Sequence, residues 1–267
     1  MTRKAILHKL WMKAPLSWAI IRTAEVYLLS QIKYKRPILE VGCGDGFVTQ
    51  TLFNKLYAVD VGIDLDKEEL RRAQKTKLYK LLRKEDITST SFKNNSFSTV
   101  FANGVLEHIP NLSEALVEIN RILKKGGQLI TTSPTNNYCR LLFYYRLLHG
   151  LKLNPLANIY GRCVNRFFAH IHLYDHLRWE KLLTQAGLKL EYYTYYNNKF
   201  SIGIHDICLP FAIFTKFLKA KTDRMVLLPK VRSIFVPPLS KLIEQRIFEI
   251  TNNYNSNASI FMVAKKI

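Results

Sequence analysis

The stretch Pro37–Phe47, PILEVGCGDGF, decides the fold of this chain. A short apolar run around Glu40 leads into three alternating glycines, and a helical pattern follows from 47 to 56. Apolar run, glycine turn and helical pattern predict a strand, a tight loop and a helix. Because glycine has no Cβ, such a loop lets the backbone approach a ligand closely. It would lie at the carboxyl end of a strand, where open α/β sheets bind ligands.

The glycine spacing rules out two common nucleotide motifs. The dinucleotide fingerprint G-x-G-x-x-G needs a glycine three residues after Gly44, where Phe47 stands, and the G-K-[ST] of a P-loop is absent. The pattern from Glu40 to Gly46 is E-x-G-x-G-x-G. It resembles motif I of the class I S-adenosylmethionine-dependent methyltransferases, in particular the group called methyltransferase type 11.

Four later segments resemble the same family, in the family's order. They are VGIDLD (61–66), EDI (85–87), SFSTVFANGVLEHIPN (96–111) and EALVEINRILKKGGQLITTSP (114–134). Taken alone, the glycine segment could be a plain turn, and Asp64 could cap the next helix. The joint match in order and spacing over 37–134 favours the family.

The resemblance implies an α/β fold: a Rossmann-like, doubly wound, seven-stranded sheet with an antiparallel last strand. We expect strands near 37–41, 58–63, 79–84, 98–103, 127–133, 188–196 and 259–264. We expect helices near 46–55, 66–76 and 112–124. The residues 124–127 (KKGG) should end the last of these helices, because lysines favour the negative end of the helix dipole and glycine commonly follows a helix C-terminus. N-terminal helices over 4–32 and helical insertions complete the fold. We expect a helical cover at 1–36 and a methyltransferase domain at 37–267, with insertions at 138–171 and 197–257.

The implied cofactor is S-adenosyl-L-methionine. By resemblance, the glycine loop packs under its methionine part, with Glu40 near the amino group, and Asp64 binds the ribose hydroxyls. A carboxylate suits that role because it can accept two hydrogen bonds from a cis-diol. Asp86 is expected at the adenine amine and Ile87 at its ring. The expected cofactor-binding residues are Glu40, Gly42, Cys43, Gly44, Gly46, Asp64, Leu65, Asp86, Ile87 and Asn103.

Three residues are candidates for catalysis. In the family the loop 103–108 faces the methyl group and substrate, so His108 could be a general base, or could simply pack under the loop. His172 and Tyr174 precede a helix and by resemblance could point at the substrate, or the segment could be an N-terminal cap with Asp175. His172 and His176 have a spacing that could bind metal, but no third ligand is evident, and we expect no metal.

The net charge of +20 over 267 residues points to a polyanionic neighbour: nucleic acid, an anionic membrane surface or an acidic substrate. A lysine-rich proteome would also explain it. The loop 103–108 lacks an N-P-P-Y-like sequence and a nucleophilic cysteine, which favours a partner other than nucleic acid without excluding it. The oligomeric state stays open.

Cysteine usage bears on the compartment. The four cysteines form no C-x-x-C pair, so a disulfide framework is not expected.

Residues 1–21 begin like a signal peptide, but Lys9 and Lys13 interrupt the apolar core that such a peptide needs. We expect a cytoplasmic chain, with peripheral membrane association as an open alternative.

Both insertions are apolar and basic. Tyr138–Ala169 contains five Lys or Arg and no acidic residue, and could be a substrate lid or lie on an anionic bilayer; we favour the lid. In the second insertion, Phe211–Lys221 is amphipathic and Val236–Leu239 holds two prolines. Membrane contact, a partner surface and a hydrophobic substrate tunnel all remain open for it.

The predicted function is methyl transfer to a small-molecule or lipid-type acceptor. The alternatives are an RNA or protein methyltransferase, or a catalytically silent cofactor-binding partner subunit.

Overall fold

The computed structural model describes residues 2–53, 55–222, 236, 238, 241 and 243–267, with the side chains of 213–222 left out. The described chain divides into two compact units. The sheet unit comprises Ile32–Thr135, Ala169–Thr194 and Ile260–Ile267. The helical unit comprises Met1–Gln31, Asn136–Phe168 and Tyr195–Ser259. The N-terminal helices therefore share a unit with most of both predicted insertions.

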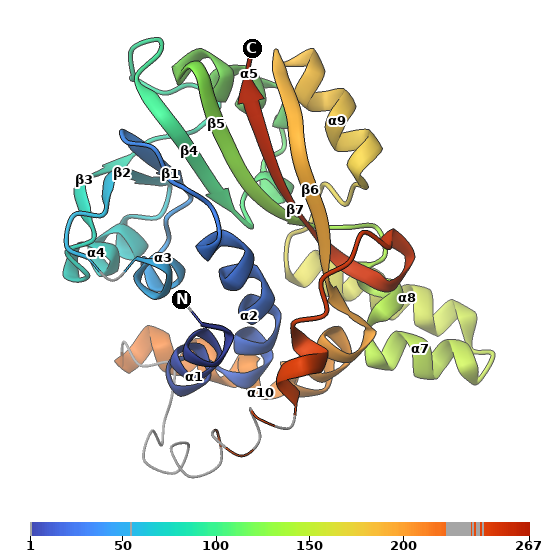
Figure 1. The fold of residues 1–267 in the computed structure, drawn as a ribbon. Helices are drawn as coiled ribbons and strands as arrows, with labels where there is room; N and C mark the ends of the chain where they lie inside the picture. The colour runs from blue at the N-terminus through green and yellow to red at the C-terminus, as the bar shows by residue number, and fades with distance from the viewer. Residues whose placement is uncertain (1, 54, 223–235, 237, 239–240, 242) are drawn as a thin grey trace. The chain divides into compact units, whose positions relative to one another are not determined.

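The sheet has the predicted doubly wound order. Within the described residues it contains seven strands in the order β3-β2-β1-β4-β5-β7-β6 (Figure 1). These are β1 (Ile38–Val41), β2 (Val59–Asp64), β3 (Tyr79–Lys84), β4 (Phe97–Asn103), β5 (Leu123–Pro134), β6 (Leu188–Asn198) and β7 (Asn257–Lys266). The first five strands pair in parallel, and Figure 1 shows β7 running opposite to β4. The predicted fold class is confirmed.

The order of the strands indicates at which edge of the sheet a ligand would bind. From β1 the chain moves outward to β2 and β3, then crosses to β4 on the other side of β1. The carboxyl ends of β1 and β4 therefore flank the point where the strand order reverses, and open α/β sheets bind ligands there. The centre of the sheet is buried on both faces, as the parallel strands require: Leu39, Ile63, Val100, Phe101 and Leu129 are all almost inaccessible.

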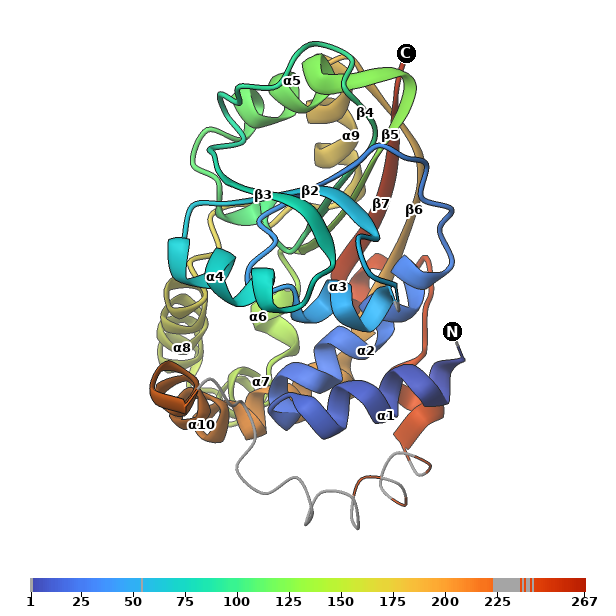
Figure 2. The same ribbon diagram turned by 90° about the vertical axis from the view of Figure 1, so that its left-hand side faces the viewer.

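Helices cover both faces of this sheet. They are α3 (Phe47–Leu52), α4 (Lys67–Lys75), α5 (Leu112–Ile122) and α9 (His176–Gln185). In Figure 2, α3 and α4 lie on one face, and α5 and α9 on the other. The predicted cap of α9 is confirmed, because Asp175 accepts a hydrogen bond from the Arg178 amide at 2.9 Å.

One local prediction in this unit was wrong, and one alternative interpretation is excluded. Helix α5 ends at Ile122 rather than at Lys124, because Leu123 is extended, fully buried and paired with Phe97 of β4. The residues KKGG (124–127) therefore belong to β5. The cap of α4 is Asp66, whose carboxylate accepts from the amides of Glu68 and Glu69, so Asp64 is not the cap.

The helical unit gathers segments that are far apart in the sequence. It holds α1 (Arg3–Lys13), α2 (Leu16–Ser30), α6 (Tyr138–Leu141), α7 (Phe143–Gly150), α8 (Asn154–Phe167) and α10 (Lys199–Thr222). Pro15 is the N-cap of α2, so the helices expected over 4–32 form as two, α1 and α2. No described helix has the length and apolar character needed to span a bilayer. Of the proline-bearing stretch 236–239, residues 237 and 239 lie outside the described residues, as do 223–235.

A buried polar network holds α10 to its neighbours. His205 contacts the Ser17 carbonyl through Nδ1 at 3.0 Å and the Tyr138 hydroxyl through Nε2 at 3.0 Å. Because a carbonyl can only accept, Nδ1 donates to it. Burial lowers the pKa of His205 to about 4, so the ring is neutral at neutral pH and Nε2 accepts from the Tyr138 hydroxyl. The next residue, Asp206, accepts hydrogen bonds from the Tyr144 amide at 2.9 Å and from the Tyr160 hydroxyl. The pair thus links α10 to α2, α6, α7 and α8.

Candidate active site

A cavity of about 490 Å³ opens at the carboxyl ends of the strands in the sheet unit. Four separate segments line it: the end of β1, the end of β2, the loop after β3 and the loop after β4. Six of the residues predicted for the site are among its walls: Gly42, Asp64, Leu65, Asp86, Ile87 and His108. The structure therefore brings together residues as far apart in the sequence as Gly42 and His108.

The glycine loop needs its glycines for backbone geometry. Gly42, Gly44 and Gly46 all have positive φ, at 63°, 50° and 74°. A Cβ on Gly42 would lie 2.5 Å from Cγ2 of Val105, whereas a Cβ on Gly44 would meet no atom within 4 Å. Gly42 thus makes room for the loop after β4, and Gly44 leaves open space beside the strand end.

Asp64 links the end of β2 to this loop. Its Oδ2 accepts a hydrogen bond from the Gly44 amide at 2.8 Å, and its Oδ1 accepts from the Asp66 amide at 2.9 Å. A carboxylate has about four lone-pair sites, so each oxygen can accept one further bond. Asp64 can therefore hold the glycine loop and still receive two hydroxyls from the cavity, as a ribose diol would require.

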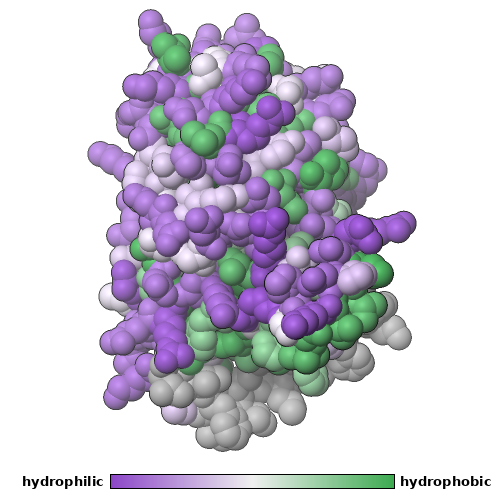
Figure 3. Space-filling model, turned by 90° about the vertical axis from the view of Figure 1, so that its right-hand side faces the viewer, coloured by the Kyte–Doolittle hydropathy of each residue, from purple (hydrophilic) through white to green (hydrophobic). Residues whose placement is uncertain are grey.

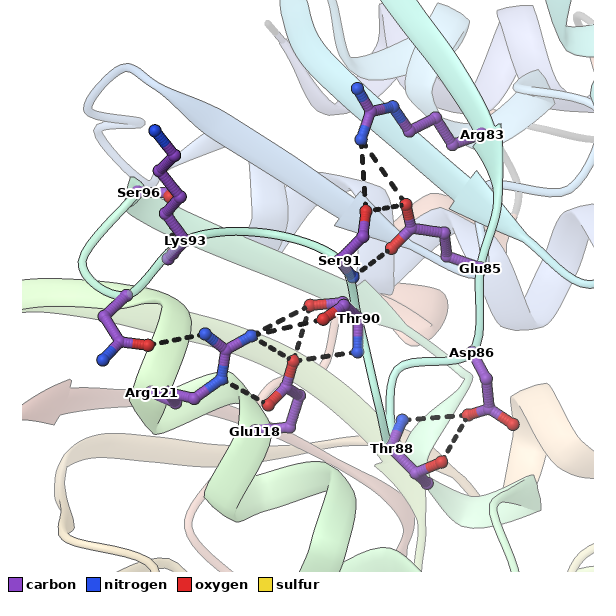
Figure 4. A network of polar contacts seen from close by, with 11 residues as sticks. Arg83, Glu85, Asp86, Thr88, Thr90, Ser91, Lys93, Ser96, Glu118 and Arg121 are labelled. Carbon is purple, nitrogen blue, oxygen red and sulfur yellow. Dashed lines mark hydrogen bonds and ion pairs between the residues drawn. The ribbon is translucent and has the colours of Figure 1, made fainter.

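Asp86 and Ile87 form the wall after β3. Both the amide and the hydroxyl of Thr88 donate to Oδ1 of Asp86, at 2.9 and 2.8 Å, and the other oxygen lies away from Thr88 (Figure 4). Ile87 is buried and lines the cavity, which offers an apolar surface to a flat ring. A carboxylate oxygen next to an apolar wall suits an aminopurine, as the resemblance implies.

A polar network fixes this loop from behind (Figure 4). The Thr90 amide and hydroxyl donate to Oε1 of Glu118 on α5, at 2.9 and 2.6 Å. Arg121 donates to the same carboxylate, and its hydrogen bonds hold the pKa of Glu118 at about 2. Ser91 donates in turn to Glu85. The loop 85–91 is thus anchored at both ends, which presents Asp86 and Ile87 to the cavity.

His108 lines the cavity and has a partner near each ring nitrogen. Its Nδ1 lies 3.0 Å from the Ala169 carbonyl, and because that oxygen can only accept, Nδ1 holds the proton. The neutral ring then has its lone pair on Nε2, which lies 3.8 Å from the buried Glu107 carboxylate. His170 stacks against the ring at 5.6 Å between centroids. This arrangement leaves Nε2 as the nitrogen that can take a proton.

His172 and Tyr174 belong to a set of hydrogen bonds between the segment 171–174 and the loop 107–109, which we call the clasp. The Nε2 of His172 donates to the Ile109 carbonyl at 2.8 Å, so its Nδ1 accepts from the Tyr174 hydroxyl at 3.0 Å. The amides of Ile171 and His172 both donate to the Glu107 carbonyl. The segment 171–174 is therefore tied to the loop 107–109 that carries His108. Neither His172 nor Tyr174 lines the cavity, and their role at the substrate stays a prediction.

Comparison with known proteins identifies the domain. Residues 39–131 match the family described as "Methyltransferase domain". The chain carries a class I S-adenosylmethionine-dependent methyltransferase domain. The predicted family and cofactor, S-adenosyl-L-methionine, are confirmed. An uncharacterized methyltransferase of Schizosaccharomyces pombe is 31% identical over 123 residues, which are 42% of this chain and 44% of that protein. The methyltransferase domain thus spans about half or less of the curated relatives it matches.

Two solved structures are similar to the whole fold. A S-adenosylmethionine-dependent methyltransferase of Thermotoga maritima, described as a possible histamine N-methyltransferase, has a TM-score of 0.56 at 16% identity, over 93% of this chain and 91% of that one. A geranyl diphosphate C-methyltransferase of Streptomyces coelicolor A3(2), in complex with Mg²⁺, geranyl diphosphate and S-adenosyl-L-homocysteine, has a TM-score of 0.51 at 15% identity, over 91% and 76%. At these identities the likeness concerns the fold alone.

Glu40 lies behind the glycine loop of the methyltransferase domain. It is buried, and its two oxygens accept from the Thr49 hydroxyl at 2.5 Å and the Tyr79 hydroxyl at 2.9 Å. Burial raises its pKa to about 8. It is not among the cavity-lining residues, and the same holds for Cys43, Gly44, Gly46 and Asn103. Sequence reasoning missed Thr49 and Tyr79, because nothing in a single sequence pairs them with Glu40.

Proposed function

We propose that this chain transfers the methyl group of S-adenosyl-L-methionine to a small-molecule or lipid-type acceptor at a membrane surface. One observation carries the cofactor part: Asp64 both holds the glycine loop and lines the cavity at the reversal of the strand order. The open space at Gly44 and the apolar wall at Ile87 fit the rest of that cofactor.

The residues of the chain act by position. When bound, the cofactor supplies an electrophilic methyl carbon and a neutral thioether leaving group. Asp64 and Asp86 would hold it through hydrogen bonds, and the anchored loop 85–91 presents Ile87 to the side on which its adenine ring would lie. An acceptor bound in the same cavity would take the methyl group, and the thioether would be released. His108 takes the proton of a hydroxyl or amine acceptor on Nε2, and Glu107 favours the resulting positive charge.

Calorimetric titration with S-adenosyl-L-homocysteine tests the cofactor part. We expect wild type to bind, and Asp64→Ala to bind roughly tenfold or more weakly, because two hydrogen bonds to the ligand are lost. Asp66→Ala is the matched control, since that carboxylate caps α4 and does not line the cavity. Folded wild type that fails to bind, or an Asp64→Ala variant that binds as tightly, would refute the assignment.

A labelled methyl group tests the acceptor class. Wild type is incubated with methyl-labelled cofactor in four separate reactions. Each reaction contains one class of acceptor: lipid extract, small metabolites, RNA or protein. Incorporation into the lipid or metabolite fraction is expected. Incorporation into RNA or protein alone would replace the proposed acceptor, and cofactor binding without any incorporation would favour a catalytically silent partner subunit.

A further inference from the structure

Helix α8 carries a second apolar stripe that faces solvent. Leu156, Ile159, Cys163 and Phe167 follow one another at steps of three, four and four residues, which places them on one face of a helix. All four are exposed, with fractions of 50% for Leu156, 47% for Ile159 and 48% for Phe167. The helix already has its buried face, formed by Ala157, Gly161 and Val164. The exposed stripe is therefore not needed for the core.

The end of α7 and the turn that follows it extend this apolar surface. Leu147, Leu151 and Leu153 are exposed by 48%, 61% and 42%, and none of the described residues of α7 is buried. Figure 3 is viewed from the side on which α7 and α8 lie in Figure 1, and it shows hydrophobic side chains gathered in the lower part of that face. We call residues 143–167 the hairpin. Contiguous exposed apolar surface of this kind marks an interaction site.

The charge of the hairpin restricts what can cover it. From Tyr138 to Ala169 the chain has no acidic residue. Arg162 and Arg166 are exposed and border the apolar stripe, each one position before a member of it, and Lys152 stands in the turn. The nearby carboxylate of Asp206 is fully buried under the hairpin and presents no negative charge at its surface. The surface therefore combines aliphatic side chains with positive charge alone.

The hairpin is held in place from beneath. Asp206 accepts from the Tyr144 amide of α7 and the Tyr160 hydroxyl of α8, so one carboxylate fastens both helices. The Cys139 thiol donates to the Gly161 carbonyl at 3.3 Å, where the missing side chain of Gly161 allows close packing. Both helices are thus anchored on their inner faces, and the outer stripe is presented as a fixed surface.

We propose that this hairpin docks on an anionic phospholipid bilayer. The leucines and Ile159 enter the boundary between headgroups and acyl chains, while Arg162, Arg166 and Lys152 contact lipid phosphates. A second copy of the chain fits this surface poorly, because two such hairpins would repel each other. Nucleic acid is also a poorer match, since single strands are held by aromatic stacking and charge, and the exposed stripe is mainly aliphatic. The inference rests on the proposed function and deepens it by naming the surface that meets the membrane.

Vesicle flotation with the full chain tests the docking. The probes are phosphatidylcholine vesicles with and without phosphatidylglycerol, at low and high salt. We expect flotation with the anionic vesicles only, and less of it at high salt because the charges are screened. Arg162→Gln/Arg166→Gln should lower partitioning about fivefold per residue. Leu156→Asn/Ile159→Asn should lower it by roughly tenfold per residue, because apolar burial is lost.

Matched controls lie in the sheet unit. Lys124→Gln/Lys125→Gln removes the same charge, and Val117→Asn/Leu177→Asn removes comparable exposed apolar surface. Both should float like wild type. The docking is refuted if wild type does not float, if the hairpin variants float as well as wild type, or if the chain binds RNA and not vesicles. Titration with S-adenosyl-L-homocysteine on the same samples separates the two proposals: binding without flotation removes the docking alone, and flotation without binding removes the cofactor assignment alone.

Discussion

The Tyr79 hydroxyl reaches across β2 to donate a hydrogen bond to Glu40, with 2.9 Å between the two oxygens. The residues belong to β3 and β1, which do not pair with each other. Gly62 of β2 lies between them, paired with Glu40 on one side and Leu82 on the other. A Cβ at Gly62 would lie 2.8 Å from the Tyr79 ring. The glycine in VGIDLD thus leaves room for the Tyr79 side chain of β3 to reach Glu40, which lies behind the glycine loop.

Gly62→Ala should therefore destabilise the sheet unit. The added methyl group must displace the buried ring of Tyr79 or the side chain of Leu82, and such overpacking costs about 1–3 kcal/mol. Urea unfolding measures the loss. Gly150→Ala, where a Cβ would meet nothing within 4 Å, is the control and should be nearly neutral. In the Tyr79→Leu background the Gly62→Ala cost should shrink, since the ring is gone. An equal cost in both backgrounds would contradict the steric account.

Glu40 should make stability fall as the pH rises. Its pKa moves from the ordinary 4.5 to about 8, chiefly through burial, so the folded chain holds this proton more tightly than the unfolded chain. The contribution is complete below pH 4.5 and is lost as the pH rises through 8. Between pH 5 and pH 8 it amounts to roughly 3 kcal/mol. Glu40→Gln cannot ionise, so urea unfolding at both pH values should show a flatter dependence than wild type. An unchanged slope would mean that Glu40 is ionised in the folded chain.

The glycine loop offers a comparison of two substitutions. Gly42→Ala combines a positive φ with a Cβ only 2.5 Å from Val105, whereas Gly44→Ala has a positive φ in open space. Backbone strain of roughly 1–2 kcal/mol applies to both, and the clash adds to it at Gly42 alone. Thermal unfolding should rank Gly42→Ala as the less stable variant. Gly44→Ala should instead weaken S-adenosyl-L-homocysteine binding beyond its cost in stability, because the methyl group occupies space near Asp64. The reverse ranking in stability would contradict the geometry.

The sequence predicts the part of the cavity wall whose signals are local. A glycine loop, a strand ending in Asp64 and the pair Asp86–Ile87 are each written in a few consecutive residues, and the parallel strands bring them to one edge. The contact of Tyr79 with Glu40 and the clasp of His172 with Ile109 depend on tertiary placement. The clasp uses backbone carbonyls, which leave no trace in side-chain identity. The helix end at Ile122 was missed because burial of Leu123 overrides the cap signal of the glycines that follow.

His205 should give the opposite pH dependence. Burial lowers its pKa from the ordinary 6.5 to about 4, so the unfolded chain binds the proton more tightly. Its contribution is complete above pH 6.5 and is lost as the pH falls towards 4, by roughly 3 kcal/mol. His205→Gln should remove this slope while lowering stability at neutral pH, because Ser17 and Tyr138 lose their partner. Urea unfolding at pH 4.5 and pH 7 compares the two chains. If wild type and variant lose stability in parallel on acidification, this histidine is not the group responsible.

His108 should act in the chemical step rather than in cofactor binding. Its Nδ1 is committed to the Ala169 carbonyl, so only Nε2 can accept a proton from the acceptor. With the acceptor fraction that incorporates label, His108→Asn should lower kcat by roughly 10²–10⁴-fold, the usual contribution of a general base. The affinity for S-adenosyl-L-homocysteine should change far less. His170→Asn is the matched control, since that ring stacks on His108 but is not among the residues that line the cavity, and its effect on kcat should be much smaller. Equal losses in both variants, or a loss confined to affinity, would assign His108 to packing of the loop.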